Sequence, residues 1–154
     1  MKICQLLSPE TTFVCDEVTS KKKVLEKVSQ IVADKCSISS KCVFESLVCR
    51  EKLGTTALGN GVAIPHGRIS ECQQAISVFL LLETPIDYDA PDKQSVDIIF
   101  AILVPEEAHN DHLRHLAEVA EILSQQKLLT KLRHAHCGEA LYDILEDAAN
   151  SLPK

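Results

Sequence analysis

The chain has 154 residues, of which 45% are hydrophobic, and this is enough for one compact domain with its own core. A net charge of -6 disfavours DNA or RNA as a partner, because no basic stripe interleaved with aromatic residues offsets it. Seven scattered cysteines without a C-x-x-C pair disfavour a disulfide framework and a zinc knuckle, so we expect reduced, mostly buried thiols. No signal-peptide pattern or long apolar run is present, so we expect a cytoplasmic location without membrane insertion.

The first third predicts a short strand and two helices. Residues 13–15 fit an edge strand. Residues 20–36 place apolar side chains at helical spacing behind a capping serine, and the lysine run at 21–23 is interpreted as a solvated face. A second helix is expected from residue 40 to 53, where Gly54 ends it.

The middle of the chain predicts strands. Residues 62–64 form a short strand, and Pro65 stiffens the backbone so that His66 is held at a strand end. Residues 75–82 and 96–104 are nearly continuous apolar runs followed by prolines, which is typical of central strands covered on both faces. Residues 86–88 are a candidate edge strand.

The last third predicts three helices, which begin near Asn110, near Leu128 and beyond a break at Gly138. Helices before, between and after the strands indicate an α/β fold. We therefore expect residues 1–154 to form a single layered domain, with a mixed β-sheet flanked by helices on both faces.

The segment 54–69 holds four of the five glycines and is the first candidate for a site. His66 is followed by Gly67 and preceded by Gly59-Asn60-Gly61, and free backbone N–H groups at these four residues are predicted to cradle an anion such as phosphate. A single histidine of this kind is about as often structural as functional, so the residues around it must decide between the two interpretations.

Phosphoryl transfer to a histidine requires one neutral ring nitrogen facing the donor, while the other nitrogen keeps its proton and binds an acceptor. Cationic or N–H donors must also stabilise the transferred group. Arg50, in the last turn of a helix, and His112, in the first turn of the helix after strand 96–104, are the candidates. For Arg50, a favourable contact with the helix dipole is a sufficient structural explanation by itself.

Other chemistries find less support. His109, His112 and His115 are spaced three apart, but residues 109 and 115 lie well round a helix from one another, so we expect neither a metal nor another cofactor. A Cys–His hydrolase built on Cys49 lacks a nucleophile elbow. His115 is interpreted as a surface or partner-facing residue, and His134 and His136 as exposed cations.

Several segments together resemble the enzyme IIA components of the phosphoenolpyruvate phosphotransferase system, in the fructose/mannitol class and its nitrogen-regulatory branch. These segments are REKLG at 50–54, GNGVAIPHG at 59–67, ETPI at 83–86, LVP at 103–105, and His112-Leu113 with Leu116. The resemblance implies that His66 accepts a phosphoryl group, on Nε2, from an HPr-type phosphocarrier. It also implies that Arg50 and His112 stabilise that group, and that the family's mixed sheet between helices is present.

The resemblance further implies a phosphotransferase component with a phosphohistidine intermediate, whose phosphorylation state controls partners such as potassium transport regulators or sensor kinases. The Gly-Asn-Gly loop and the single domain favour this regulatory branch. One alternative is a sugar-specific IIA subunit that passes phosphate to a separate IIB. Another, of a different class, is a phosphorylation-independent module that binds an anion at His66.

Overall fold

The computed structural model describes residues 7–70, 74–106 and 111–150, and the side chains of all of these except 111–115. Its centre is a six-stranded mixed sheet of order β1-β5-β6-β3-β2, in which β4 also pairs with β6. β5 and β6 are antiparallel, whereas β1 runs parallel to β5, and β3 and β4 run parallel to β6. The strands are β1 (Thr12–Cys15), β2 (Ala57–Gly59), β3 (Val62–Ala63), β4 (His66–Ile69), β5 (Ile76–Ile86) and β6 (Val96–Pro105).

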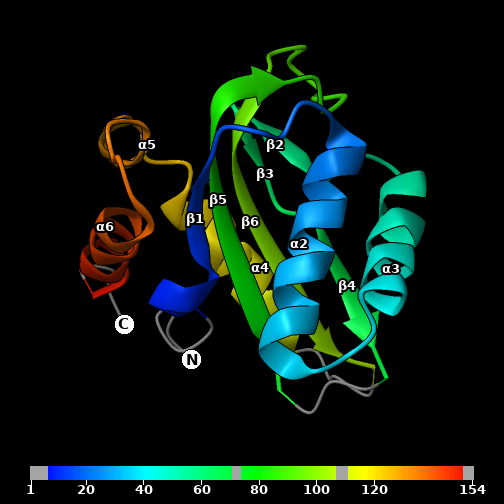
Figure 1. Cartoon of the computed structure of the whole chain (residues 1–154). Helices are drawn as coiled ribbons and strands as arrows, with labels where there is room; N and C mark the ends of the chain where they lie inside the picture. The colour runs from blue at the N-terminus through cyan, green and yellow to red at the C-terminus, as the bar shows by residue number, and fades with distance from the viewer. Residues whose placement is uncertain (1–6, 71–73, 107–110, 151–154) are drawn as a thin grey trace.

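Helices cover both faces of the sheet, which confirms the predicted architecture (Figure 1). The helices α2 (Lys21–Cys36) and α3 (Ser40–Lys52) lie on one face. The opposite face carries α4 (Asp111–Ile122), α5 (Gln126–Arg133) and α6 (Gly138–Asn150), while a short 3-10 turn, η1 (Pro9–Thr11), precedes β1. No helix in the described part of the chain is both long and apolar enough to cross a bilayer.

The alternation of side chains along β5 divides the core into two halves. Val78 and Leu80 pack in the half beneath α2 and α3, whereas Phe79 and Leu81 pack in the half beneath the C-terminal helices. Phe79 meets Phe100 of β6 edge to face, with ring centroids 5.9 Å apart. Burial on both faces explains why β5 and β6 are nearly continuous apolar runs.

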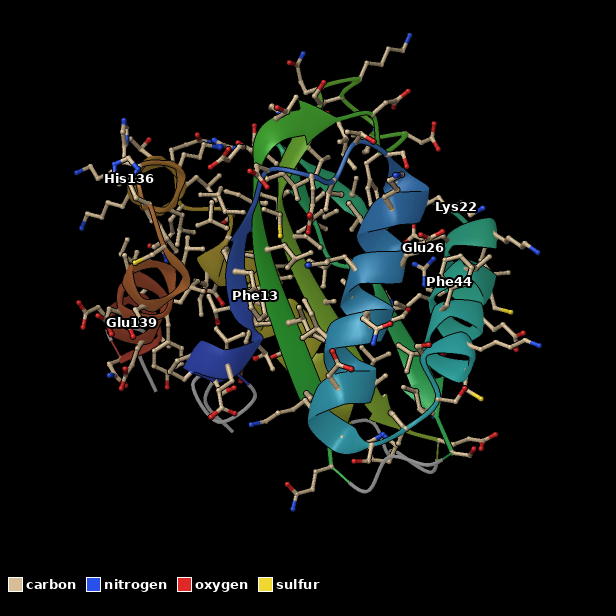
Figure 2. The ribbon with its side chains drawn as sticks, viewed as in Figure 1. Phe13, Lys22, Glu26, Phe44, His136 and Glu139 are labelled. Carbon is tan, nitrogen blue, oxygen red and sulfur yellow. The ribbon has the colours of Figure 1, made fainter. Side chains whose placement is uncertain are left out.

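The two N-terminal helices follow the local signals closely. The Ser20 hydroxyl accepts the Lys23 N–H at 3.2 Å to cap α2, and the Ser39 hydroxyl caps α3 through Cys42. α3 ends at Lys52, one residue before the expected end. Figure 2 shows Lys22 on α2, and its side chain is exposed, as predicted for the lysine run.

Lys21 departs from that prediction, because it does not belong to a solvated face. Its Nζ lies 3.1 Å from a carboxylate oxygen of Glu51 and 4.6 Å from the ring centre of Tyr88. Lys21 therefore joins the start of α2 to the end of α3 and to the segment after β5.

Two strand predictions need correction. His66 does not follow the end of one strand; it begins β4, and Pro65 separates β4 from β3 although both pair with β6. β5 continues through Pro85 to Ile86, so residues 86–88 are not a separate edge strand. A register shift between Leu81 and Ile86 removes Pro85 from the regular ladder, where its missing N–H would otherwise cost a hydrogen bond.

Gly138 does not break a helix but is the first residue of α6. A Cβ at this position would overlap the carbonyl oxygen of Thr12, so glycine lets α6 approach the backbone of β1. The expectation of buried thiols was also wrong for most described cysteines. Cys15 is buried, but four others are exposed: Cys36, Cys42, Cys49 and Cys137.

Candidate functional site

The half-buried His66 ring is oriented by the chain that leads into β4. Its Nδ1 lies 2.8 Å from the carbonyl oxygen of Ile64. Because a carbonyl can only accept, Nδ1 carries the proton and Nε2 carries the lone pair. The carbonyl of Pro65, between these two residues, accepts the N–H of Ile102 at 3.0 Å. The segment 64–66 is thereby fixed to β6, and the tautomer of His66 with it.

Arg50 binds the other ring nitrogen. From the last turn of α3 its Nε donates to Nε2 of His66 at 3.2 Å, and its Nη1 donates to the carbonyl oxygen of Gly54 at 2.8 Å. The guanidinium is therefore held at two points. The prediction that Arg50 flanks His66 agrees with this geometry, and a favourable interaction with the helix dipole is not its sole contact.

These surroundings lower the pKa of His66 below its usual range. Burial is the main cause, because it disfavours the charged ring, and the positive charge of Arg50 acts in the same direction. The hydrogen bond to Ile64 and the negative charge of Glu51 oppose the shift. The net result is a neutral imidazole near pH 7, with a lone pair on the nitrogen that faces Arg50.

Two pockets meet at His66 and share Arg50 and Leu116 in their walls. The first, which we name the Arg68 pocket, has a volume of about 350 Å³ and is lined by Ser46, Cys49, Arg50, Leu53, His66, Gly67, Arg68, Ile102, Val104 and Leu116. The second, the Leu58 pocket, has a volume of about 300 Å³ and is lined by Arg50, Thr55, Thr56, Ala57, Leu58, Ile64, His66, Leu116, Ala117 and Ala120. None of the described lining residues of either pocket carries a carboxylate.

Gly67 belongs to this site, but the other predicted cradle residues do not. Gly59 ends β2, and Asn60 and Gly61 form the turn to β3; none of the three lines a pocket with His66. The Asn60 N–H donates to the Asp92 carboxylate at 2.9 Å, so it is already engaged. Asn60 and Gly61 instead line a third pocket of about 520 Å³ together with Arg133. Of the four predicted cradle residues, only Gly67 lines a pocket with His66.

The structure places His112 in the first turn of α4, four residues before Leu116, and its side chain is outside the described residues. His109 lies outside them altogether, as does the side chain of His115. In the described part of the chain, no group of three or more His, Cys, Asp or Glu side chains is arranged to hold a metal ion. His134 is the C-cap residue that follows α5, and it is exposed, as is His136 (Figure 2).

Arg68 is a lining residue that sequence reasoning missed. It follows His66 by two residues on β4, and side chains two apart on a strand share a face. Its Nη1 donates to the carbonyl oxygen of Glu106 at 3.2 Å. The signal was the spacing of two, which became readable only once β4 was known to begin at His66.

Cys49 also lines the Arg68 pocket. Both ring nitrogens of His66 are engaged, one by Ile64 and the other by Arg50, so neither is placed to activate the Cys49 thiol. The geometry therefore gives no support to a Cys–His hydrolase. What the site offers is a neutral, oriented imidazole beside two guanidinium groups, and this arrangement suits a group that carries negative charge.

Comparison with known proteins agrees with this chemistry. Residues 5–148 match the sequence model of the family described as "Phosphoenolpyruvate-dependent sugar phosphotransferase system, EIIA 2". The chain is 43% identical to a nitrogen regulatory protein of Pseudomonas aeruginosa over 151 residues, which cover 97% of this chain and 98% of that protein.

Two solved structures share the fold. The nitrogen regulatory protein IIA-Ntr of Neisseria meningitidis is 40% identical, with a TM-score of 0.86 and coverage of 93% of this chain and 98% of that one. Enzyme IIA-mannitol of Escherichia coli, solved in complex with phosphorylated enzyme IIB-mannitol, is 17% identical with a TM-score of 0.75, covering 92% of this chain and 97% of that one. At that identity the second structure shows the common fold alone.

The resemblance drawn from the sequence motifs is thus confirmed, including its nitrogen-regulatory branch. The chain belongs to the EIIA type 2 family of the phosphoenolpyruvate-dependent sugar phosphotransferase system, and it is similar over almost its full length to members named nitrogen regulatory proteins.

Proposed function

We propose that this protein is a cytoplasmic phosphocarrier and regulator of the nitrogen-related phosphotransferase system. His66 accepts a phosphoryl group reversibly from an HPr-type carrier. Its phosphorylation state then governs binding to partners such as potassium transport regulators or sensor kinases. The observation that carries the proposal is the pair of hydrogen bonds that hold the His66 ring neutral, with Nδ1 on Ile64 and Nε2 facing Arg50.

The transfer step needs only the acceptor nitrogen and charge stabilisation. The Nε2 lone pair of His66 attacks phosphorus, the bond between phosphorus and the carrier's ring nitrogen breaks, and that nitrogen keeps the electron pair. The proton on Nδ1 stays in its bond to the Ile64 carbonyl throughout, so the new phosphohistidine retains its orientation. No proton has to be removed from His66 before attack, because burial and Arg50 already keep the ring neutral.

Arg50 changes partner during this step. Its Nε donates to Nε2 in the unphosphorylated protein, so it must move to the phosphoryl oxygens when the new bond forms. Movement over one hydrogen-bond length keeps the guanidinium beside the developing charge. Gly67 contributes to the wall around the oxygens. We assign His112, in the first turn of α4, as a second stabilising donor.

Exposed leucines give a carrier protein an apolar surface to dock on. Leu53, in the wall of the Arg68 pocket, is 84% exposed, and Leu58, in the wall of the Leu58 pocket, is 48% exposed. Large exposed apolar side chains beside a reactive group are typical of a protein-binding surface. A phosphoryl group on His66 would place negative charge between these leucines, and this supports two electrostatically distinct docking states.

Intact-mass analysis tests the proposal. The protein is incubated with phosphoenolpyruvate, an enzyme I-type kinase and an HPr-type carrier, beside the variants His66→Ala and His134→Ala. His134 is a matched control, because its Nδ1 also lies close to a backbone carbonyl, that of Thr130 at 2.7 Å, but it lines none of the three pockets described above. We expect one acid-labile phosphoryl group on the wild type and on His134→Ala, and none on His66→Ala.

Absence of phosphorylation with carriers of both the nitrogen and the sugar branch would instead favour a phosphorylation-independent anion-binding module. A further arm separates the two phosphotransferase functions. The phosphorylated protein is mixed with a IIB domain of the fructose or mannitol type. Retention of the phosphoryl group supports a regulator, whereas rapid transfer to IIB would identify a sugar-specific IIA subunit.

A further inference from the structure

Glu51, the residue after Arg50, is a carboxylate that the transfer step does not use. It lies at the end of α3 with its side chain only 6% exposed. The Thr56 N–H donates to its Oε1 at 3.1 Å, the Thr56 hydroxyl donates to Oε2 in a short bond, and the Tyr88 hydroxyl donates to Oε2 at 3.3 Å. The Nζ of Lys21 completes the set at 3.1 Å from Oε1.

The partners of Glu51 are themselves fixed in place. Tyr88 is fully buried, and burial followed by the charge of Glu51 raises the pKa of Tyr88, so its hydroxyl remains a donor. Lys21 lies over the ring of Tyr88 and pairs with Glu51. The carboxylate thus joins the end of α3 to the start of α2 and to the segment after β5.

The same carboxylate closes a loop that carries the anchor of Arg50. Its bond to the Thr56 N–H joins the two ends of the segment 51–56, and Gly54 lies within this segment. The Gly54 N–H donates to the backbone carbonyl of Glu51, and the Gly54 carbonyl accepts from Nη1 of Arg50. The position of that carbonyl therefore depends on how the loop is closed.

The loop is also tied to the anchor of His66. The carbonyl of Thr56 accepts the Ile64 N–H at 3.0 Å, and the carbonyl of Ile64 receives Nδ1 of His66. The carbonyl that holds Arg50 and the carbonyl that holds His66 are thereby fixed relative to one another. Closing a surface loop with a buried carboxylate is costly, because the carboxylate loses its hydration. The presence of Glu51 beside the two site residues therefore suggests that it contributes to the site.

We propose that Glu51 is a positioning residue for the phosphoryl site: by closing the loop 51–56 it fixes the Gly54 carbonyl, and so directs Nε of Arg50 onto Nε2 of His66. The proposal rests on the phosphocarrier function given above for its kinetic test. The claim that Glu51 positions Arg50 against His66 does not depend on that function, because the hydrogen bond between Arg50 and His66 is present without a phosphoryl group.

A double-mutant cycle tests whether Glu51 acts through Arg50. Phosphorylation rates by the HPr-type carrier are measured for the wild type, Glu51→Ala, Arg50→Ala and the double variant. We expect Glu51→Ala to slow the wild type about tenfold and to slow Arg50→Ala less than about twofold, because a residue that acts only through Arg50 loses its effect when Arg50 is absent. Equal slowing in both backgrounds would overturn the proposal.

Two further variants separate positioning from folding. Glu51→Gln keeps an oxygen that can accept the Thr56 N–H, and we expect it to recover at least part of the lost rate. If Glu51→Ala does not fold, Glu51→Gln replaces it in the cycle, and the slowing that it causes in the wild type should be larger than the slowing that it causes in Arg50→Ala; equal slowing in both backgrounds would overturn the proposal. Glu45→Ala is the matched control, since Glu45 is on the same helix with a side chain that is 61% exposed, and its rate should equal that of the wild type.

Nuclear magnetic resonance gives a readout that needs no carrier. In the wild type and in Glu45→Ala, the Arg50 Nε–H should exchange slowly with water, and the His66 Nε2 nitrogen should have the shift of a hydrogen-bonded acceptor. Both signatures should be lost in Glu51→Ala at a temperature where that variant is folded. Their retention would overturn the proposal, whereas failure of the wild type to become phosphorylated would count against the phosphocarrier function alone.

Discussion

Both nitrogens of the His66 ring have partners of opposite type. Ile64 offers a carbonyl oxygen at 2.8 Å to Nδ1, and Arg50 offers an N–H at 3.2 Å to Nε2. A protonated ring would need acceptors on both sides, so this pair of partners stabilises the neutral ring in one tautomer. The reactivity proposed for His66 therefore depends on one backbone contact and one side-chain contact, and not on the histidine alone.

The lowered pKa of His66 predicts the pH dependence of phosphorylation. An unperturbed histidine is half protonated at about pH 6.5, whereas the lowered pKa of His66 should move the acidic limb of its rate profile below that pH. Arg50→Gln removes a charge that lowers this pKa, so the acidic limb of the profile should move to higher pH. The measurement is the kcat/KM of each protein for phosphorylation by the carrier as a function of pH, at constant ionic strength, because kcat/KM reports the pKa of the free protein. An acidic limb at the same pH in both would contradict the role given to Arg50.

At the scale of elements, Gly138 controls how closely α6 approaches β1. We expect Gly138→Ala to destabilise the fold by about 1–3 kcal/mol, because the added Cβ would overlap the Thr12 carbonyl and force a backbone shift. The neighbouring Glu139→Ala should change stability by less than about 0.5 kcal/mol, since Glu139 is exposed (Figure 2). Urea denaturation of both variants measures the difference. A neutral Gly138→Ala would show that the contact relaxes freely.

The helices and the two central strands were predictable because their signals are local. Ser20 caps α2, apolar residues repeat at helical spacing, and β5 and β6 are continuous apolar runs. The boundary between β3 and β4 was not predictable in this way. It depends on both strands pairing with the same neighbour on either side of Pro65, a contact between residues far apart in sequence.

The same distinction, between local signals and contacts between residues far apart in sequence, applies to the site. His66 and Arg50 were singled out because they lie in recognisable motifs, and the structure brings the two side chains together. Gly61 was misplaced because nearness in sequence was taken for nearness to the ring. Its carbonyl receives the N–H groups of Asp97 and Ile98, whereas His66 pairs with Ile102, four residues further along β6. Register along the sheet decides which residues meet, and the register is a property of the whole sheet.

Across the whole molecule, apolar and charged surface are distributed unequally around the site. The chain carries a net charge of -6, yet the charged side chains among the described residues that line the Arg68 pocket are two arginines. Exposed Leu53 lines this pocket, and exposed Leu58 lines the adjoining Leu58 pocket together with Arg50. A negatively charged phosphoryl group presented on a carrier surface would meet attraction from these cations, although the chain as a whole carries net negative charge.

Leu53→Ser tests this docking surface. Leu53 is 84% exposed, so we expect the stability to stay within about 0.5 kcal/mol of the wild type. The kcat/KM for phosphorylation by the carrier should fall about tenfold because KM rises while kcat is unchanged. This is the loss expected when one leucine is no longer buried at the interface. Phe13→Ser is the control, because Phe13 lies on β1, across the molecule from α3 (Figure 2). Equal effects of the two substitutions would exclude a specific surface around Leu53.

The bond between Arg50 and His66 also bears on which ions the site admits. A neutral imidazole with a free Nε2 is a common ligand for zinc and copper ions. In this protein the Nε2 lone pair already accepts a hydrogen bond, and the donor is a permanent cation that repels any divalent metal approaching from that side. The neutral imidazole that we propose as the phosphoryl acceptor would otherwise attract metal ions, and we expect Arg50 to make His66 selective for anions over metals before any partner arrives.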